Sequence, residues 1–260
     1  MPVLTNSQLK LYQSLHHKKY RHRHGLFIAD GPHLVEAALN SDWTVDRVIV
    51  RDDDLNPAKI LRIPINITAS LPAAKFDKLA PSESPQGILA IVKSRPLNMI
   101  NADLIKTARR IIALDRVTDP GNVGTIIRTA AAFGFDMVVC IEECAEIYNP
   151  KTIRATQGAI FSIPITEIEL CGDFIKTFAK SFDLAVFTSG AQIPLGKAPR
   201  LKRPLLILGS EAAGVSEELA RRANYAFRIE QSDKVESLNV AVAAGVAMYR
   251  FRKSESNNAS

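Results

Sequence analysis

Residues 204–250 read PLLILGSEAAGVSEELARRANYAFRIEQSDKVESLNVAVAAGVAMYR, and this stretch decides the fold of the chain. It opens with an apolar run, Pro204 to Leu208, that is typical of a buried parallel strand. A turn of small residues from Gly209 to Ser216 follows, and its glycines indicate a sharp bend or a close approach to a ligand. Ser216 can cap a short helix that begins at Glu217. A strand followed by such a turn predicts an α/β fold.

The second half of the stretch repeats this arrangement. We expect a strand at residues 226–229 and then a polar loop that ends at Glu236. The next segment, Ser237 to Tyr249, begins with a capping residue and is apolar on nearly every side, so we expect a helix that is covered on more than one face. Two loops at the carboxyl ends of strands therefore predict a ligand site in an open α/β sheet.

The turn from Gly209 to Gly214 has the glycine spacing of a phosphate-binding loop, but Val215 stands where that loop needs a lysine. A Gly-x-Gly-x-x-Gly sequence occurs nowhere in the chain. Nucleoside triphosphates and dinucleotides are therefore disfavoured as ligands.

Composition narrows the class of protein. The 260 residues suit one large domain or two small ones, and a hydrophobic content of 47% is ample for a core. We expect neither a signal peptide nor a membrane span, since no apolar run approaches about 18 residues. The cysteines Cys140, Cys144 and Cys171 form no Cys-x-x-Cys pair, which favours reduced thiols and a cytoplasmic location. The net charge of +6 permits a polyanionic partner.

Positive charge gathers at the N-terminus. The first 25 residues contain no acid and four of the five histidines. A solvated, partly mobile basic arm and a nucleic-acid clamp are both open interpretations. A histidine metal site is disfavoured because no cysteine or carboxylate completes a ligand set. The cations of this segment are Lys10, Lys18, Lys19, Arg21 and Arg23.

The segment from Gly25 to Lys93 alternates strand and helix patterns, which predicts a small α/β unit. Residues 94–102 have no strong periodicity and are expected to be a linker. The strands are expected at residues 26–29, 45–50, 65–67 and 88–92, and a helix at residues 31–40.

A third informative stretch lies at residues 111–134. A buried strand at residues 111–114 leads into a loop with Asp-Pro-Gly, and a helix is expected from about Asn122 to Gly134. Asn122 and Arg128 lie six residues apart on that helix. Taken alone, Asn122 is a helix cap and Arg128 a surface cation.

Three motifs in order carry a resemblance to a known family. They are Leu-Asp-x-Val-x-Asp-Pro-x-Asn-Val-Gly-x-Ile-x-Arg-Thr-Ala from Leu114, Leu-Gly-Ser-Glu-x-x-Gly-Val-Ser from Leu208, and Ser-Leu-Asn-Val-Ala-Val-Ala from Ser237. They resemble the motifs of the SpoU/TrmH group of SPOUT RNA methyltransferases. The resemblance implies transfer of a methyl group from S-adenosylmethionine (AdoMet) to a ribose 2′-hydroxyl of RNA. It also implies a SPOUT catalytic domain with a C-terminal deep trefoil knot, and a homodimer.

The N-terminal part is similar to a second module. The segments Phe27 to His33 and Pro85 to Ile88 resemble the substrate-binding domain of SpoU-type enzymes, which is similar to the L30e ribosomal-protein fold and implies RNA capture. The predicted organisation is a basic arm and L30e-like domain over residues 1–95, a linker over residues 96–103, and the methyltransferase domain over residues 104–260. His33 is expected to be structural.

The resemblance also implies the site residues. Glu211 is expected to hold Asn122 or a neighbouring loop in place, and Arg128, which is a poor base, to orient the 2′-hydroxyl together with an RNA phosphate. One departure is Ile229-Glu230-Gln231, where the family usually has Ile-Pro-Met. The expected catalytic residues are Asn122, Arg128, Glu211, Ser237 and Asn239, and those expected at AdoMet are Thr188, Gly190, Gly209, Ile229 and Leu238. Of the first group, Asn122, Ser237 and Asn239 are neutral donors or acceptors and are expected to orient the ribose and phosphate. The cations expected at RNA are Lys18, Lys19, Arg21, Arg23, Lys151 and Arg154.

The leading hypothesis is therefore an AdoMet-dependent RNA ribose 2′-O-methyltransferase, with 23S ribosomal RNA as the expected substrate and no metal. A transfer RNA substrate and an rRNA-binding protein that has lost catalysis are the alternatives. The second alternative needs the loss of Arg128, Asn122 or Ser237, and all three are present. A small-molecule enzyme is disfavoured because it leaves the basic segment without a purpose.

Overall fold

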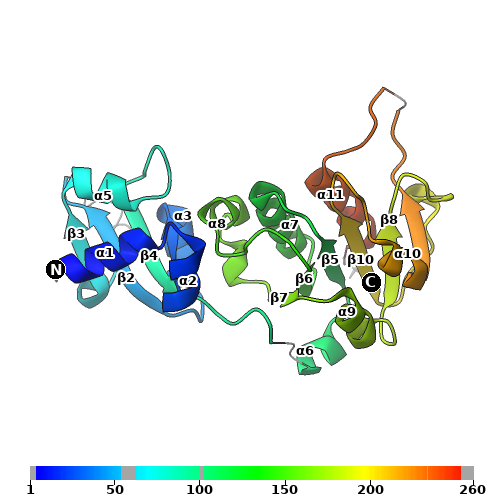
Figure 1. Cartoon of the computed structure of the whole chain (residues 1–260), viewed down its shortest axis with the longest axis horizontal. Coiled ribbons are helices and arrows are strands. Elements are labelled where there is room, and N and C mark those ends of the chain that lie inside the picture. The colour runs from blue at the N-terminus through cyan, green and yellow to red at the C-terminus, as the bar shows by residue number, and fades with distance from the viewer. Residues whose placement is uncertain (1–3, 54–62, 100–101, 233, 253–260) are drawn as a thin grey trace, which may run out of the picture. The chain divides into compact units, whose positions relative to one another are not determined.

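A computed structural model describes residues 4–53, 63–99, 102–232 and 234–252. The chain forms two compact units (Figure 1). Unit 1 consists of Met1–Pro96 and Glu146–Ser162, and unit 2 of Leu97–Ala145 and Ile163–Ser260. Residues 146–162, which the sequence placed in the predicted methyltransferase domain, therefore pack with the N-terminal unit.

Unit 1 is built on a four-stranded sheet of order β1-β4-β2-β3. Its central strand β4 runs antiparallel to both neighbours, while β2 and β3 are parallel. Three of the four predicted strands are confirmed, but the prediction of a strand at residues 65–67 is wrong: these residues form a 3-10 turn, and β3 begins directly after it. The strands are β1 (Leu26–Asp30), β2 (Val45–Arg51), β3 (Thr68–Leu71) and β4 (Ile88–Lys93).

Helices cover both faces of this sheet. On one face, Tyr12, Leu15 and Phe76 pack in a core with Ile49 and Ile91. On the other, α3 contacts β1, β2 and β4, and α8 contacts β1. The helices of unit 1 are α1 (Asn6–Ser14), α2 (Lys18–His24), α3 (Pro32–Leu39), α5 (Ala73–Leu79) and α8 (Pro150–Thr156).

The basic N-terminal segment is folded, so the interpretation as a mobile arm is wrong for the described residues. Thr5 and Gln8 form a capping box at the start of α1. Tyr12 is 2% exposed, and its hydroxyl donates to Asp46 at 2.7 Å. Burial, followed by this contact, raises the pKa of Tyr12 to about 12. An apolar stem thus anchors the cations of α2 on unit 1.

Unit 2 is an open sheet of order β7-β6-β5-β10-β8-β11-β9, and its strand pairs are parallel. The predicted α/β class is confirmed. The two predicted strands of residues 204–229 are present, each shifted by at most one residue. The strands are β5 (Ile111–Asp115), β6 (Met137–Ile141), β7 (Ile165–Ile168), β8 (Asp183–Phe187), β9 (Ile193–Pro194), β10 (Pro204–Gly209) and β11 (Tyr225–Arg228).

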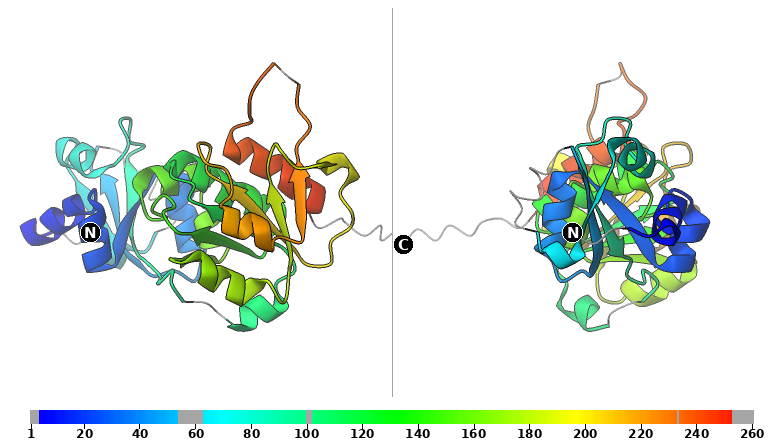
Figure 2. Two further views of the ribbon diagram at one scale, coloured as in Figure 1. Left: turned by 45° about the vertical axis from the view of Figure 1, so that its right-hand side comes forward. Right: turned by 90° about the vertical axis from the view of Figure 1, so that its left-hand side faces the viewer.

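Two helix layers enclose this sheet. Figures 1 and 2 show α7 and α11 side by side on one face, where they contact each other. On the other face Phe174 of α9 and Leu219 of α10 enter a core with β5, β8 and β10. The helices of unit 2 are α6 (Ala102–Thr107), α7 (Pro120–Ala132), α9 (Cys171–Phe178), α10 (Glu217–Arg222) and α11 (Val240–Phe251).

Two helix starts differ from expectation. The last helix begins at Val240 and is capped by Asn239, so Ser237 is not its cap. Ser216 occupies the cap position of α10, but its side chain makes no capping bond.

Residues 100–101 of the predicted linker and the tail 253–260 lie outside the described residues. None of the described helices has the length and apolar character needed to cross a membrane.

Candidate active site

Unit 2 contains a pocket of about 800 Å³ at the carboxyl ends of β8, β10 and β11. This is the position that the sequence predicts for a ligand site in an open α/β sheet. Four of the residues expected at AdoMet line it, whereas Gly190 is not among its described lining residues. The four are Thr188, Gly209, Ile229 and Leu238.

Gly209 is required by the shape of the turn that follows β10. A Cβ atom at this position would lie 2.0 Å from the carbonyl group of Gly214. Gly214 itself has φ +65° and donates its amide to the Ser210 carbonyl at 2.8 Å. The main chain therefore folds directly back over Gly209 and forms one wall of the pocket.

A cluster of three polar side chains joins the three sequence motifs. Asn122 Nδ2 donates to Glu211 Oε1 at 2.9 Å. Asn239 Nδ2 donates to the same oxygen at 3.0 Å and to Asn122 Oδ1 at 3.0 Å. The predicted contact between Glu211 and Asn122 is thereby confirmed, and Glu211 also lines the pocket.

The geometry changes the role expected for Asn239. Its Oδ1 caps α11 by accepting from Ala241 N and Val242 N, and both hydrogens of its Nδ2 serve Asn122 and Glu211. A primary amide has two N–H donors, so none remains for a ribose. Asn239 therefore holds Asn122 and Glu211 in place.

The two other expected catalytic residues lie apart from this cluster. Ser237 is exposed and lines the pocket. Arg128 is exposed on α7, about 120° around the helix from Asn122. Within the described residues its guanidinium makes no hydrogen bond or ion pair, so its donors are available to a ligand.

Asp115 is a positioning residue that the sequence analysis did not single out. It is 1% exposed at the end of β5. It accepts from the backbone amide of Ser216 at 2.6 Å and from Arg116 Nε at 3.0 Å. The bond to Asp115 raises the pKa of Arg116. The signal was an aspartate directly after a buried strand, in the first motif.

The cations expected at RNA fall into two groups. Lys18, Lys19 and Arg23 are exposed on α2, and Lys151 and Arg154 are exposed on α8. Both helices belong to unit 1. Among the described residues, no three His, Cys, Asp or Glu side chains gather as a metal site.

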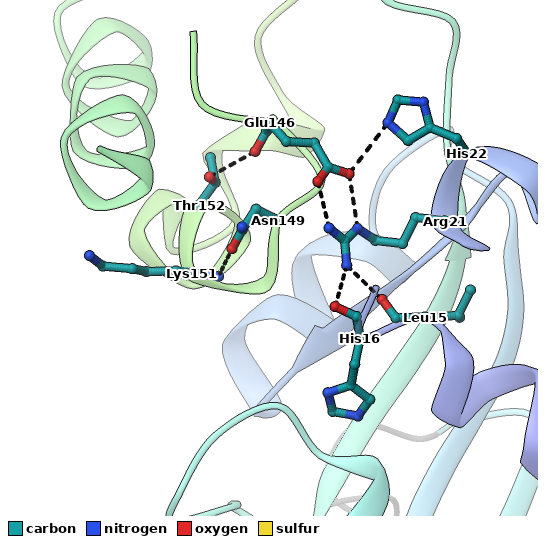
Figure 3. Close-up of polar contacts among 8 residues, drawn as sticks. All are labelled: Leu15, His16, Arg21, His22, Glu146, Asn149, Lys151 and Thr152. Carbon is teal, nitrogen blue, oxygen red and sulfur yellow. Dashed lines mark hydrogen bonds and ion pairs between the residues drawn. The ribbon is translucent and has the colours of Figure 1, made fainter. Parts of the chain in front are cut away.

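Arg21 does not belong to either group, and its prediction as an RNA contact is wrong. It is 4% exposed, and its guanidinium pairs with both carboxylate oxygens of Glu146 at 2.9 and 2.5 Å (Figure 3). It also donates to the carbonyl oxygens of Leu15 and His16. Every nitrogen of the guanidinium is used inside unit 1, where Arg21 joins α2 to the segment that leads into α8.

Comparison with known proteins identifies the class. The model of the SpoU rRNA Methylase family matches residues 109–249, more than half of the chain. The MRM3-like substrate binding domain matches residues 6–90. The chain therefore belongs to the SpoU rRNA methylase family, whose members are AdoMet-dependent RNA 2′-O-methyltransferases.

Individual relatives span the same length as this chain. It is 34% identical to the 23S rRNA (guanosine(2553)-2′-O)-methyltransferase RlmP of Bacillus subtilis, over 95% of this chain and 96% of that protein. It is 24% identical to the 23S rRNA (uridine(2479)-2′-O)-methyltransferase of Streptomyces viridochromogenes, over 94% and 88%. An AdoMet-bound rRNA methyltransferase from Sinorhizobium meliloti superposes with a TM-score of 0.82 at 28% identity, covering 96% of this chain and 95% of that one.

The pocket of unit 2 suits AdoMet, the methyl donor of the family. Leu208, Ile229 and Leu238 supply apolar walls, and the turn at Gly209 exposes main-chain groups. Such a surface can hold an adenine ring by apolar contact and backbone hydrogen bonds. Glu230 and Gln231, which replace the usual Pro-Met, add polar groups to one edge.

Proposed function

We propose that this protein transfers the methyl group of AdoMet to a ribose 2′-hydroxyl of 23S ribosomal RNA. The observation that carries the proposal is the hydrogen-bonded cluster of Asn122, Glu211 and Asn239 beside a pocket that suits AdoMet. Two 23S rRNA 2′-O-methyltransferases among the relatives match nearly the whole chain. This supports ribosomal RNA as the substrate.

The proposed mechanism depends mainly on positioning. AdoMet supplies the methyl group when bound. Ser237 at the pocket and Asn122 beside it offer neutral donors and acceptors to the ribose. The exposed Arg128 binds an RNA phosphate and orients the 2′-hydroxyl, whose oxygen gains negative charge as its proton passes to solvent. Asn239 and Glu211 hold Asn122 in place for this contact.

We also propose a homodimer that forms through α11. Val242, Val246 and Tyr249 are 53%, 41% and 56% exposed, and their spacing of four and three residues places them on one face of the helix. A second copy of the chain covers this apolar stripe in the proposal. We further propose that α11, which packs on α7 and β10, completes the trefoil knot expected from the family. The cytoplasm is the proposed location, where ribosomal RNA is present.

The test is transfer of labelled methyl from AdoMet to unmodified 23S, 16S and transfer RNA transcripts. We expect label on 23S RNA, located at one ribose that resists alkaline cleavage. Arg128→Ala is expected to lower the rate of labelling by about 10²–10³-fold. Label on transfer RNA alone would show that transfer RNA, not 23S ribosomal RNA, is the substrate. Tight RNA binding without label on any transcript would favour an RNA-binding protein without catalysis.

A further inference from the structure

Unit 1 has a hollow surface of its own, at the carboxyl end of β1. Two depressions of about 600 and 310 Å³ share five lining residues, so they form one continuous site, which we call the unit 1 hollow. Its size falls within the range of ligand pockets, about 300–1,000 Å³. The shared residues are Asp30, Leu34, Pro81, Ser82 and Arg154.

Asp30 is the chemically distinctive residue of this hollow. Its Oδ2 accepts from the Ser82 backbone amide at 3.2 Å and from the Ser82 hydroxyl at 2.5 Å. Its Oδ1 is buried and has no hydrogen-bond partner among the described residues. An unpaired buried oxygen is costly, and each one in a native protein calls for an explanation, such as a functional role or a bound water or ion. A ligand with an N–H donor would satisfy Oδ1.

Two cations, Arg154 and Lys151, and one further carboxylate, Glu83, line the hollow together with Asp30. Burial raises the pKa of Asp30, and the nearby Arg154 acts in the opposite direction. Arg154 is exposed and lines both depressions, and its guanidinium makes no hydrogen bond or ion pair within the part of the chain that the structure describes. Lys151, one helical turn earlier on α8, lines the smaller depression. The hollow therefore combines cations suited to phosphate with a carboxyl oxygen suited to a donor.

A buried ion pair holds these cations in place. Arg21 of α2 forms a hydrogen-bonded ion pair with the carboxylate of Glu146 (Figure 3). The backbone carbonyl of Glu146 accepts from the Thr152 hydroxyl of α8 at 2.9 Å. Asn149 caps the same short helix through Lys151 N. Because Arg21 and Glu146 are 4% and 9% exposed, this attachment is shielded from solvent. The positions of Lys151 and Arg154 beside Asp30 are thus fixed by the fold of unit 1.

We propose that the unit 1 hollow binds one unstacked nucleotide of the substrate RNA, and that Asp30 selects a base with an exocyclic amino group. Arg154 and Lys151 bind its phosphate. Adenine, cytosine and guanine each carry an amino group that can donate to Oδ1. The terminal torsion of an aspartate is soft, so a small rotation turns Oδ1 toward a donor in the hollow. The identification of the ligand as RNA rests on the proposed function.

Uracil is the base that this arrangement excludes. Its single ring N–H lies between two carbonyl oxygens. When that N–H approaches Oδ1, the carbonyl oxygens also come close to the carboxylate and repel it. We therefore expect bases with an amino group to be preferred over uracil by about tenfold, as for one hydrogen bond to a charged group.

The experiment measures binding to the full chain of fluorescein-labelled heptauridylate and of heptamers with a single central adenosine, cytidine or guanosine. Fluorescence anisotropy is recorded at one fixed salt concentration and without AdoMet. We expect at least one of the three substituted heptamers to bind about tenfold more tightly than heptauridylate.

Asp30→Asn gives the decisive comparison. If the amide oxygen of the new side chain accepts from Ser82, its NH₂ group lies where Oδ1 was and donates to a ligand. The preference is then expected to reverse toward heptauridylate, which a merely structural role of Asp30 would not produce. Asp52→Asn, at an exposed position of unit 1, is the matched control and should leave the preference unchanged. Arg154→Gln should weaken binding of all heptamers about equally.

Three outcomes would overturn the inference. They are equal binding of the four heptamers, failure of all four heptamers to bind, and an unchanged base preference in Asp30→Asn. Methyl transfer distinguishes it from the proposed function. An enzyme that methylates RNA but shows no base preference refutes the role of Asp30 alone. A preference that reverses in the variant, in a protein that methylates no RNA, refutes the proposed function alone.

Discussion

The pocket of unit 2 and the hollow of unit 1 differ in how far their polar side chains are hydrogen-bonded within the protein. In unit 2, Asn122, Glu211 and Asn239 bond to one another, so their geometry is set before a ligand arrives. In unit 1, Ser82 pairs one oxygen of Asp30 and leaves the other without a described partner. Groups that must stabilise developing charge benefit from a preset geometry. A group that selects a ligand must instead retain a donor or acceptor atom that has no partner within the protein.

The largest expected effect is on the attachment of α8 in unit 1. Arg21→Ala leaves the buried carboxylate of Glu146 with only the ring of His22, whose Nε2 lies 3.5 Å from Oε1. Removing one partner of a buried ion pair costs up to about 3–5 kcal/mol. Urea unfolding should show this loss. The matched control is Arg23→Ala, two residues along the same helix but exposed, where a change within about 0.5 kcal/mol is expected. Equal stability of the two variants would show that the ion pair does not hold the hollow together.

The next effect concerns the active site. Arg128→Ala should lower kcat by about 10²–10³-fold, the usual loss when one donor to developing charge is removed. Arg222 is an exposed arginine on α10 of the same unit, and Arg222→Ala should retain activity. Single-turnover methyl transfer at saturating RNA measures the ratio. A loss confined to RNA affinity would reduce Arg128 to a binding residue.

A smaller effect separates the two tasks of Asn239. Asn239→Ala removes the helix cap and the bonds to Asn122 and Glu211, so we expect about 1 kcal/mol lower stability together with lower activity. Asn239→Ser keeps a capping oxygen but cannot bridge to Asn122 and Glu211. It should therefore keep most of the stability and lose activity. Full activity in the serine variant would show that a preset cluster is unnecessary, which would remove the contrast with Asp30.

The smallest effect tests the cost of an unpaired oxygen in unit 1. Because burial raises the pKa of Asp30 in the folded protein, folding favours its protonated form. That contribution to stability is present below the unfolded pKa and is lost as pH rises through the folded pKa. At pH 7, Asp30→Asn should therefore be as stable as the original protein or slightly more stable, by less than about 1 kcal/mol.

Thermal unfolding between about pH 3 and pH 7 checks this expectation, since unperturbed carboxyl groups titrate near pH 4. The original protein should gain stability relative to Asp30→Asn as the pH falls, whereas Asp52→Asn should show no such crossover. A variant that is less stable at pH 7 and equally stable at pH 3 would contradict it.

The sequence alone determined the class of the fold and the identity of the pocket. The apolar runs of β5 and β10, each followed by a polar turn, required parallel strands with a site at their carboxyl ends, because main-chain geometry dictates where such turns meet. The resemblance of the three motifs to those of the SpoU family implied that Asn122, Glu211 and Asn239 belong to one site. The same resemblance implied that Gly209, Ile229 and Leu238 hold AdoMet, and all three line the pocket.

Tertiary structure alone decided which side chains remain available. Arg21 and Arg23 are both arginines in one basic segment, yet one is buried against Glu146, 125 residues away in sequence, and the other is exposed. Asn239 looked like a ribose ligand until its donors proved to be used by Asn122 and Glu211. The sequence did not indicate a role for Asp30. Its role depends on Ser82, which pairs only one of its two carboxylate oxygens, and on Arg154, which lines the same hollow. Residue type and spacing indicate what a side chain can bond, but its partner is chosen by long-range packing.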